Sequence, residues 1–244
     1  MPGTTTAART GYTAHAAVTA ELGPHGVTRL TRLRSDGPIA LRETPDGVYL
    51  VGAAAGPVGG DRLRLDIVVG PGAHLRIRSV ATAMAMPGSG ESVYTIDARV
   101  EGRLDFAPEP SIAVRGCFHR AVSRIDLGPE GGLRWLEELV LGRHREEPGR
   151  HVSRIDVTRE GRPLLRHELR LDSAARSRAV VGDAKAVGSL VRTDATAPAH
   201  AEEGVALLPL AAGGLLVNAV APDSAALRRL LLRAEEAPGP FSRS

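Results

Sequence analysis

The stretch that decides the fold is Leu63-Arg64-Leu65-Asp66-Ile67, in which apolar and charged residues strictly alternate. After a Pro71-Gly72 turn, His74-Leu75-Arg76-Ile77-Arg78 repeats the alternation. A period of two is typical of a β-strand with one buried face, because successive side chains point to opposite sides. We therefore expect these two runs to pair as a β-hairpin.

The same pattern continues through most of the chain. Further predicted strands cover residues 93–100, 104–106, 122–127, 135–141, 152–158 and 164–171. Glu101-Gly102 separates the first two of them as a second predicted hairpin. Arginine alternates with Asp and Glu on the polar faces, which predicts cross-strand ion pairs. The fold class is therefore mainly β, in stacked sheets.

Two segments near the C-terminus differ in pattern. Residues 204–222 carry no charge before Asp223, but Gly213-Gly214 divides them, so we expect two buried strands and no membrane span. Asp223 is a predicted N-cap for a C-terminal helix that buries Leu227, Leu230 and Leu231 and turns its arginines outward. Residues 172–178 are expected to form a short second helix, and 194–203 a loop.

Length and composition exclude several classes of protein. The 244 residues hold 31 Lys+Arg against 28 Asp+Glu, a net charge of +3 without a basic cluster, so we expect no nucleic-acid partner. The N-terminus lacks the apolar block of a secretory signal, which predicts a cytoplasmic protein. We expect one domain over residues 11–236, with 1–10 and 237–244 as tails.

The sequence lacks the usual catalytic motifs. Neither a phosphate-binding G-x-x-x-x-G-K-[ST] loop nor a G-x-S-x-G nucleophile turn occurs. Glu137 and Glu138 would face opposite sides of a strand, so they are not a ready acid–base pair. None of the eight histidines has the spacing of a local metal pair. Cys117 and His119 could share an ion from one strand face, although a buried structural cysteine is the simpler interpretation.

The stretch before the first strand, Gly56-Pro57-Val58-Gly59-Gly60-Asp61, is unusual in its glycines. Adjacent glycines allow positive φ or a close backbone approach, and the aspartate can hydrogen-bond the turn. The structural interpretation is a turn that leads into the following strand, and the functional one is an edge at which a partner docks. Asp66, inside an apolar strand, would need a cationic or amide partner if it faced inward.

At this stretch the sequence resembles the urease accessory protein family UreD, also called UreH. Three blocks carry the resemblance: residues 58–73, residues 104–112, and residues 138–143 followed by 154–171. The strand at 215–217 and the helix after Asp223 also fit the ending of the family. Their order and spacing cover about residues 15–233. The family positions that the resemblance marks for partner contact or ion transit are Gly59, Gly60, Asp61, Asp66, Gly72, Ala73, Pro108, Glu109, Glu138, Gly142 and Arg143.

The resemblance implies a helicoidal, layered β-fold and a non-catalytic maturation factor. Such a factor would bind UreF, the GTPase UreG and apo-urease, and assist nickel delivery. It would hold no cofactor tightly, contact Ni²⁺ only transiently along a weakly coordinating route, and could form a homodimer within the complex. The alternative is a stand-alone ligand-binding or enzymatic β-domain with a pocket near Asp66 or the Cys117–His119 pair.

Two departures from the family pattern stand out. Residues 79–87 lack the lysine and the polar pair that the family shows there, and Asn218 stands where an arginine is expected. Any role that the family gives these positions is in question for this chain.

Overall fold

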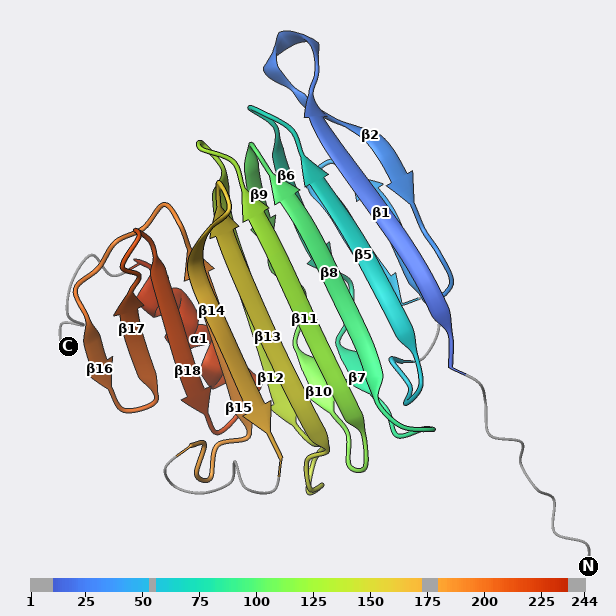
Figure 1. Ribbon diagram of the computed structural model, residues 1–244. Coiled ribbons are helices and arrows are strands. Elements are labelled where there is room, and N and C mark those ends of the chain that lie inside the picture. Colours follow the sequence, from blue (N-terminus) through green and yellow to red (C-terminus); the bar gives the residue numbers. More distant parts are fainter. Residues whose placement is uncertain (1–10, 53–55, 173–179, 237–244) are drawn as a thin grey trace, which may run out of the picture.

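The computed structural model describes residues 11–52, 56–172 and 180–236 (Figure 1). Strands dominate this part of the chain, with one short 3-10 turn, η1 (Pro24–Gly26), and one helix, α1 (Ser224–Glu236). The strands are β1 (Thr13–Leu22), β2 (Thr28–Arg34), β3 (Ile39–Thr44), β4 (Gly47–Gly52), β5 (Arg62–Val69), β6 (His74–Ser79), β7 (Ala83–Ala85), β8 (Ser92–Val100), β9 (Arg103–Phe106), β10 (Ser111–Ala113), β11 (Phe118–Leu127), β12 (Gly132–Leu141), β13 (Arg150–Arg159), β14 (Arg162–Leu171), β15 (Ala186–Arg192), β16 (His200–Glu202), β17 (Val205–Pro209) and β18 (Leu215–Ala221).

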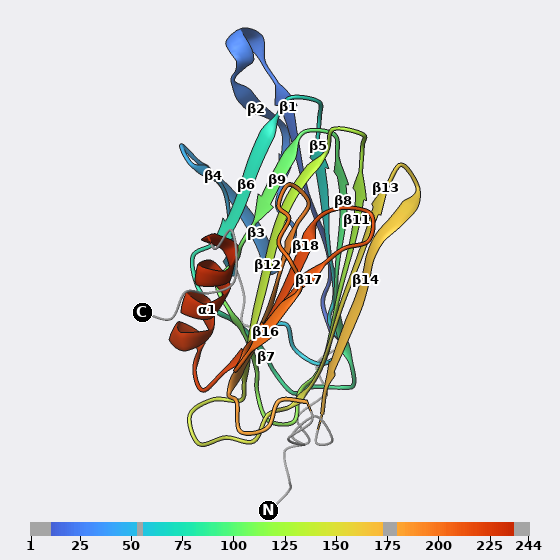
Figure 2. The same cartoon turned by 90° about the vertical axis from the view of Figure 1, so that its left-hand side faces the viewer.

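The strands form two sheets that lie face to face, with α1 on the outside of the larger one (Figure 2). Sheet A has the order β14-β13-β11-β8-β5-β1-β2. Sheet B has the order β16-β17-β18-β15-β12-β9-β6-β4-β3, and β10 joins it beside β12 and pairs with β7. The strands from β1 through β5, β8 and β11 to β13 are parallel, as are β4, β6, β9 and β12. The layered, solenoid-like β-fold expected from the sequence is confirmed.

The two hairpins predicted at residues 63–78 and 93–106 are wrong. β5 and β6 lie in different sheets, and so do β8 and β9. At the first turn the Ala73 N–H donates to the Gly70 carbonyl, 3.1 Å away, and the chain crosses to the facing sheet. Alternation reports only that one face of each strand is buried, so a hairpin and a crossing between sheets satisfy it equally.

The main core fills the space between the sheets. Leu65 and Ile67 of β5 are almost completely buried there, together with Trp135 of β12. The Trp135 ring stacks on Phe106, with 4.0 Å between centroids and 12° between planes. The outer face of sheet A carries the predicted ion pairs, such as Arg64–Asp97 across β5 and β8 at 3.1 Å. These pairs are partly exposed and contribute little stability individually.

The predicted C-terminal helix is confirmed. Asp223 Oδ1 accepts a hydrogen bond from the Ala226 N–H at 2.7 Å, as an N-cap should. Leu227 and Leu231 are fully buried against sheet B. Arg228 differs from the prediction, because it turns toward sheet B and forms ion pairs there.

The remaining segments give mixed outcomes. β17 and β18 pair antiparallel on either side of Gly213 and Gly214, which confirms the two predicted strands in 204–222. Residues 194–203 are not all loop, because β16 pairs with β17; its three residues are too few to show a period. Most of the predicted helix at 172–178 lies outside the described residues, as do the predicted tails 1–10 and 237–244.

Candidate functional site

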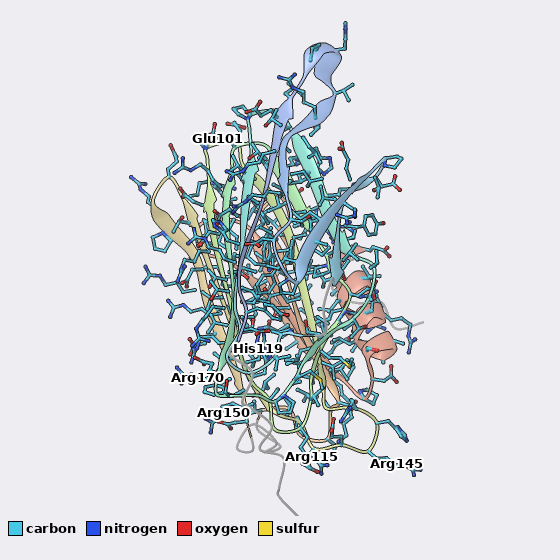
Figure 3. All side chains as sticks on the ribbon, turned by 90° about the vertical axis from the view of Figure 1, so that its right-hand side faces the viewer. Glu101, Arg115, His119, Arg145, Arg150 and Arg170 are labelled. Atoms are coloured by element: carbon cyan, nitrogen blue, oxygen red, sulfur yellow. The ribbon has the colours of Figure 1, made fainter. Side chains whose placement is uncertain are left out.

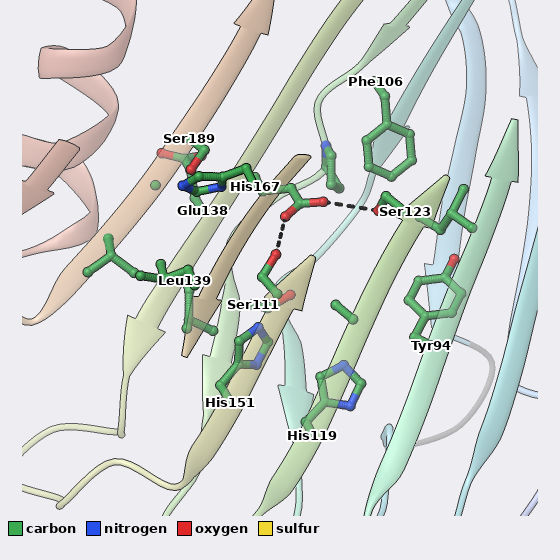
Figure 4. A pocket seen from close by; sticks show the side chains of 18 of the residues that line it. Tyr94, Phe106, Ser111, His119, Ser123, Glu138, Leu139, His151, His167 and Ser189 are labelled. Atoms are coloured by element: carbon green, nitrogen blue, oxygen red, sulfur yellow. Dashed lines mark hydrogen bonds between the residues drawn. The ribbon is translucent and has the colours of Figure 1, made fainter. Parts of the chain in front are cut away.

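A cavity of about 110 Å³ lies between the sheets, and its lining is rich in titratable side chains (Figure 4). Sheet A contributes strands β8, β11, β13 and β14, and sheet B contributes β12 and β15 with the segment from Phe106 to Ser111. The polar and titratable side chains that line it are Tyr94, Glu109, Ser111, His119, Ser123, Glu137, Glu138, His151, Ser153, His167 and Ser189.

The parallel register of sheet A brings the two central histidines together. Ser92, His119 and His151 face one another across β8, β11 and β13. The His119 and His151 rings are 5.3 Å apart, and Ser92 Oγ lies 2.9 Å from His119 Nδ1. His119 lies between the sheets, nearer the end that carries Arg115 and Arg150 than the end that carries Glu101 (Figure 3).

Burial holds these histidines in their neutral form. Desolvation lowers the pKa of His119 to about 4, although the Ser92 contact and the Asp61 charge oppose the shift. Desolvation, with a contribution from the His119 charge, lowers the pKa of His151 to about 3. Burial also lowers the pKa of His167. Neutral imidazole is the form that binds metal ions, so at neutral pH these rings can act as ligands.

Glu137 extends from sheet B into the cavity and is held by neutral donors. Trp135 Nε1 donates to its Oε1 at 2.8 Å, and Ser123 Oγ donates to the same oxygen at 3.2 Å. Ser153 Oγ donates to Oε2 at 2.6 Å, and Figure 4 marks both serine contacts. None of these three donors is charged, so the hydrogen bonds that hold this carboxylate pair it with no cation.

Glu138 points to the other face of β12, as the sequence predicted, yet it lines the same cavity. β12 pairs with β9 up to Phe106 and with β10 from Ser111, so the ladder is interrupted in between, beside Glu138. The Glu138 side chain is fully buried, and its Oε2 accepts a hydrogen bond from Arg228 Nε at 2.9 Å. Its Oε1 has no hydrogen-bond partner among the residues that the structure describes.

Glu109 completes this group at the edge of the cavity. Its Oε2 lies 3.2 Å from Arg228 Nη1, and its side chain is 43% exposed. Ser79 Oγ accepts a hydrogen bond from its backbone N–H at 2.8 Å. The predicted residues Pro108, Glu109 and Glu138 therefore all belong to the cavity. The prediction missed Arg228, which joins the two carboxylates from α1.

The glycine-rich stretch lies at one end of the sheets and has a structural role. The Asp61 carboxylate is buried and accepts the backbone N–H groups of Tyr12 and Val58, each at 2.8 Å. A Cβ on Gly59 would lie 2.7 Å from the backbone nitrogen of Gly88, so the two chain segments need glycine to approach this closely. Gly60 follows in the same turn. These residues hold neighbouring chain segments together at this end of the sheets and do not line the cavity.

The other predicted positions lie away from the cavity lining. Gly72 and Ala73 form the turn between β5 and β6. Gly142 follows β12, and Arg143 after it forms a bidentate pair with Glu146, at 2.8 and 3.0 Å. Asp66 lies on the outer face of sheet A, where it contacts Arg64 at 2.7 Å and also His15.

Cys117 and His119 have different surroundings. Cys117 is buried in an apolar cluster with Leu139 and Leu141, and its Sγ lies 3.8 Å from the Arg150 carbonyl oxygen. Burial, and then the Glu146 charge, raises the pKa of this thiol to about 11, so it is protonated at neutral pH. Because thiolate is the metal-binding form, the thiol favours a structural role.

Both departures from the family pattern border the cavity. Ser79 anchors Glu109, and the 79–87 segment contains β7, which pairs with β10. Asn218 Oδ1 accepts a hydrogen bond from Ser189 Oγ at 2.9 Å, and its amide nitrogen lies 3.4 Å from His167 Nε2. An uncharged side chain therefore stands beside the histidine-lined part of the cavity.

Two further observations concern metal ions and membranes. Within residues 11–52, 56–172 and 180–236, no three His, Cys, Asp or Glu side chains group closely enough to hold a metal ion. In the same part of the chain, no helix has the length and apolar character needed to cross a bilayer.

The fold and the cavity define a class of protein: two stacked, largely parallel sheets with a space between them whose lining includes imidazoles and carboxylates. The model of a family described as "UreD urease accessory protein" matches residues 13–240. Three relatives named urease accessory protein UreD are similar over most of their length. The one from Frankia casuarinae is 39% identical (96% of this chain, 92% of the relative), that from Frankia alni 41% (95% and 97%), and that from Streptomyces coelicolor 37% (91% and 94%).

The chain belongs to the UreD family of urease accessory proteins. It is therefore a urease maturation factor and not an enzyme, as the resemblance in its sequence blocks implied. This result decides against the alternative of a stand-alone enzymatic domain.

Proposed function

We propose that this chain binds apo-urease together with UreF and the GTPase UreG in the cytoplasm, and that Ni²⁺ passes through the cavity between the sheets. The cavity lining supports this proposal, because it combines neutral imidazoles with carboxylates around one space between the sheets. Imidazole and carboxylate are both ligands that bind Ni²⁺. The ion is cargo here, and the accessory complex would supply and receive it.

Two buried polar atoms give the strongest support for passage of a cation. Glu138 Oε1 and His151 Nδ1 line the cavity region without a hydrogen-bond partner among the described residues. A buried polar atom without a partner costs free energy, and a passing cation would satisfy both atoms. The exposed side of Glu109 gives the cavity contact with solvent at the interruption of sheet B.

The arrangement suits transit better than storage. Conduction needs binding that is favourable enough to admit an ion and weak enough to release it. The donors lie along the cavity in small groups: Glu109 with Glu138, Glu137 with its serines, and His119 with His151. An ion would exchange one or two protein ligands at a time and keep part of its water shell.

The test is urease activation in cells that express urease, UreF, UreG and this chain. His151→Ala removes one cavity imidazole, and His144→Ala, at an exposed position outside the lining, is the matched control. We expect urease from the His151→Ala strain to contain several-fold less nickel while the tagged chain still co-purifies with urease. Urease from the control should contain the wild-type amount.

Two results would overturn the proposal. Co-purification of neither UreF nor urease with the tagged chain, combined with full urease activity after its deletion, would remove the role in the complex. Normal nickel content in the His151→Ala strain would remove the role of the cavity.

A further inference from the structure

Among the residues that the structure describes, Arg228 is the one cation that contacts the carboxylates of the cavity from outside the sheets. It bridges Glu109 and Glu138, and Nε and Nη2 both donate to the same oxygen, Oε2 of Glu138. The three side chains together carry a net charge of −1, from two carboxylates and one guanidinium. Oε1 of Glu138 has no hydrogen-bond partner within the described part of the chain.

Packing holds Arg228 in this place. Its neighbour Leu227 and Leu231 one turn further on are fully buried against sheet B. At the end of the same helix, Glu235 Oε1 forms ion pairs with Arg134 Nε and Arg192 Nη1, each at 2.7 Å. Because these contacts fix α1 against sheet B, the Cα of Arg228 stays within reach of Glu109 and Glu138.

We propose that Arg228 sets the residence time of Ni²⁺ in the cavity by occupying one oxygen of Glu138 and so making this carboxylate a weaker ligand; this rests on the proposed transit through the cavity. The guanidinium occupies one carboxylate oxygen and leaves the other for the ion. Its positive charge also repels a dication a few ångströms away. Without Arg228, Glu138 would be a buried carboxylate without a counter-ion, and Ni²⁺ would become its best partner.

Arg228 is thus a positioning residue, and its removal should change the nickel affinity in an unexpected direction. Removing a positively charged residue should make the chain bind nickel more tightly and deliver it less well. A purely structural ion pair predicts the opposite, because its loss would loosen the site and weaken binding.

The experiment measures binding of Ni²⁺ alone to the purified full-length chain by isothermal titration calorimetry, and Ni²⁺ release by a chelator in stopped flow. Arg228→Met and Arg228→Gln remove the charge, and the glutamine keeps a hydrogen-bond donor for Glu138. Arg233→Met is the control, because Arg233 lies on the same helix but pairs with Glu202, at 2.7 Å, outside the cavity. The double variant Arg228→Met/Glu138→Gln tests whether the effect runs through Glu138.

We expect both Arg228 variants to bind Ni²⁺ about tenfold or more tightly and to release it correspondingly slowly. The double variant should bind Ni²⁺ no more tightly than the wild type, because it lacks the Glu138 carboxylate, and the Arg233 control should keep wild-type affinity. Wild-type or weaker binding in the folded Arg228→Gln variant would overturn the inference, and so would tight binding that survives in the double variant.

Adding the single variant Glu138→Gln to these measurements distinguishes failure of the Arg228 role from failure of the proposed function. If Glu138→Gln alone leaves both Ni²⁺ binding and urease loading unchanged, transit through the cavity fails. If Glu138→Gln reduces both but the Arg228 variants bind Ni²⁺ as the wild type does, transit stands and the role of Arg228 fails.

Discussion

The buried histidines predict a loss of stability between pH 7 and pH 5. The pKa of His119 is about 4 and that of His151 about 3 in the folded chain, against about 6.5 in the unfolded chain. In this range the unfolded chain therefore binds more protons than the folded one, so the free energy of unfolding falls as the pH falls. pH 5 lies roughly 1.5 units below the pKa of an unfolded histidine, so protonation stabilises the unfolded state by about 2 kcal/mol per histidine.

The assay is urea unfolding of the full-length chain at pH 7, 6 and 5, followed by fluorescence. Trp135 is the only tryptophan and is fully buried, so its emission reports loss of the core between the sheets. We expect the free energy of unfolding to fall by about 4 kcal/mol from pH 7 to pH 5. In His119→Gln/His151→Gln most of this dependence should disappear.

Carboxylates do not account for a change in the free energy of unfolding between pH 7 and pH 5. The pKa values of Asp105 and Glu235 are lowered by their arginine partners against the cost of burial, so the stability that they contribute is lost only below their ordinary pKa values near 4. A wild-type stability that is equal at pH 7 and pH 5, or a double variant that loses as much as the wild type, would refute the burial of neutral histidines.

Three further predictions concern stability at neutral pH. Gly59→Ala should lower the free energy of unfolding by roughly 2 kcal/mol, because its methyl group would press on the backbone of Gly88; an unchanged urea midpoint would contradict this close approach. Asp223→Ala should cost about 1 kcal/mol through loss of the N-cap, seen as reduced helical circular dichroism and a lower melting temperature. Asp61→Asn should cost roughly 2 kcal/mol, since the amide oxygen can accept only one of the two backbone N–H groups and the amide nitrogen cannot accept the other, and a stability equal to that of wild type would exclude this role.

The sequence identifies the strands but not their partners. The alternation at 63–67 correctly gives the buried face of β5, with Leu65 and Ile67 inside. The turn at 70–73 then sends the chain to the facing sheet, and nothing in the alternation distinguishes this crossing from a hairpin. Because the turns between the sheets differ in length, no fixed repeat marks the solenoid.

Parts of the site were visible in the sequence and parts were not. Glu109 and Glu138 lie in blocks that resemble the family, and both line the cavity. His119 and His151 are 32 positions apart, and only the parallel register of β11 and β13 makes them neighbours. A signal existed, since each is the first inward-facing residue of its strand, but using it requires knowing that the strands are parallel.

Arg228 shows a different limit of sequence reasoning. Its spacing on α1 predicted an outward position, and the apolar side of the helix is correct. The long side chain nevertheless reaches back to Glu138, because a buried carboxylate provides a stronger partner than water at that boundary. Helical periodicity places the Cα of a long cation but does not place its charged end.

If Ni²⁺ passes between the sheets, a bulky side chain placed in that space should block it. Ala121 lines the cavity on β11, whereas the next residue, Val122, lies on the opposite face of the same strand. The measurement is the nickel content of urease purified from cells that carry Ala121→Phe or Val122→Phe, with co-purification of each variant and urease as a check on assembly. The account predicts little nickel with Ala121→Phe and wild-type nickel with Val122→Phe. Full nickel content with a folded, assembled Ala121→Phe chain would contradict it.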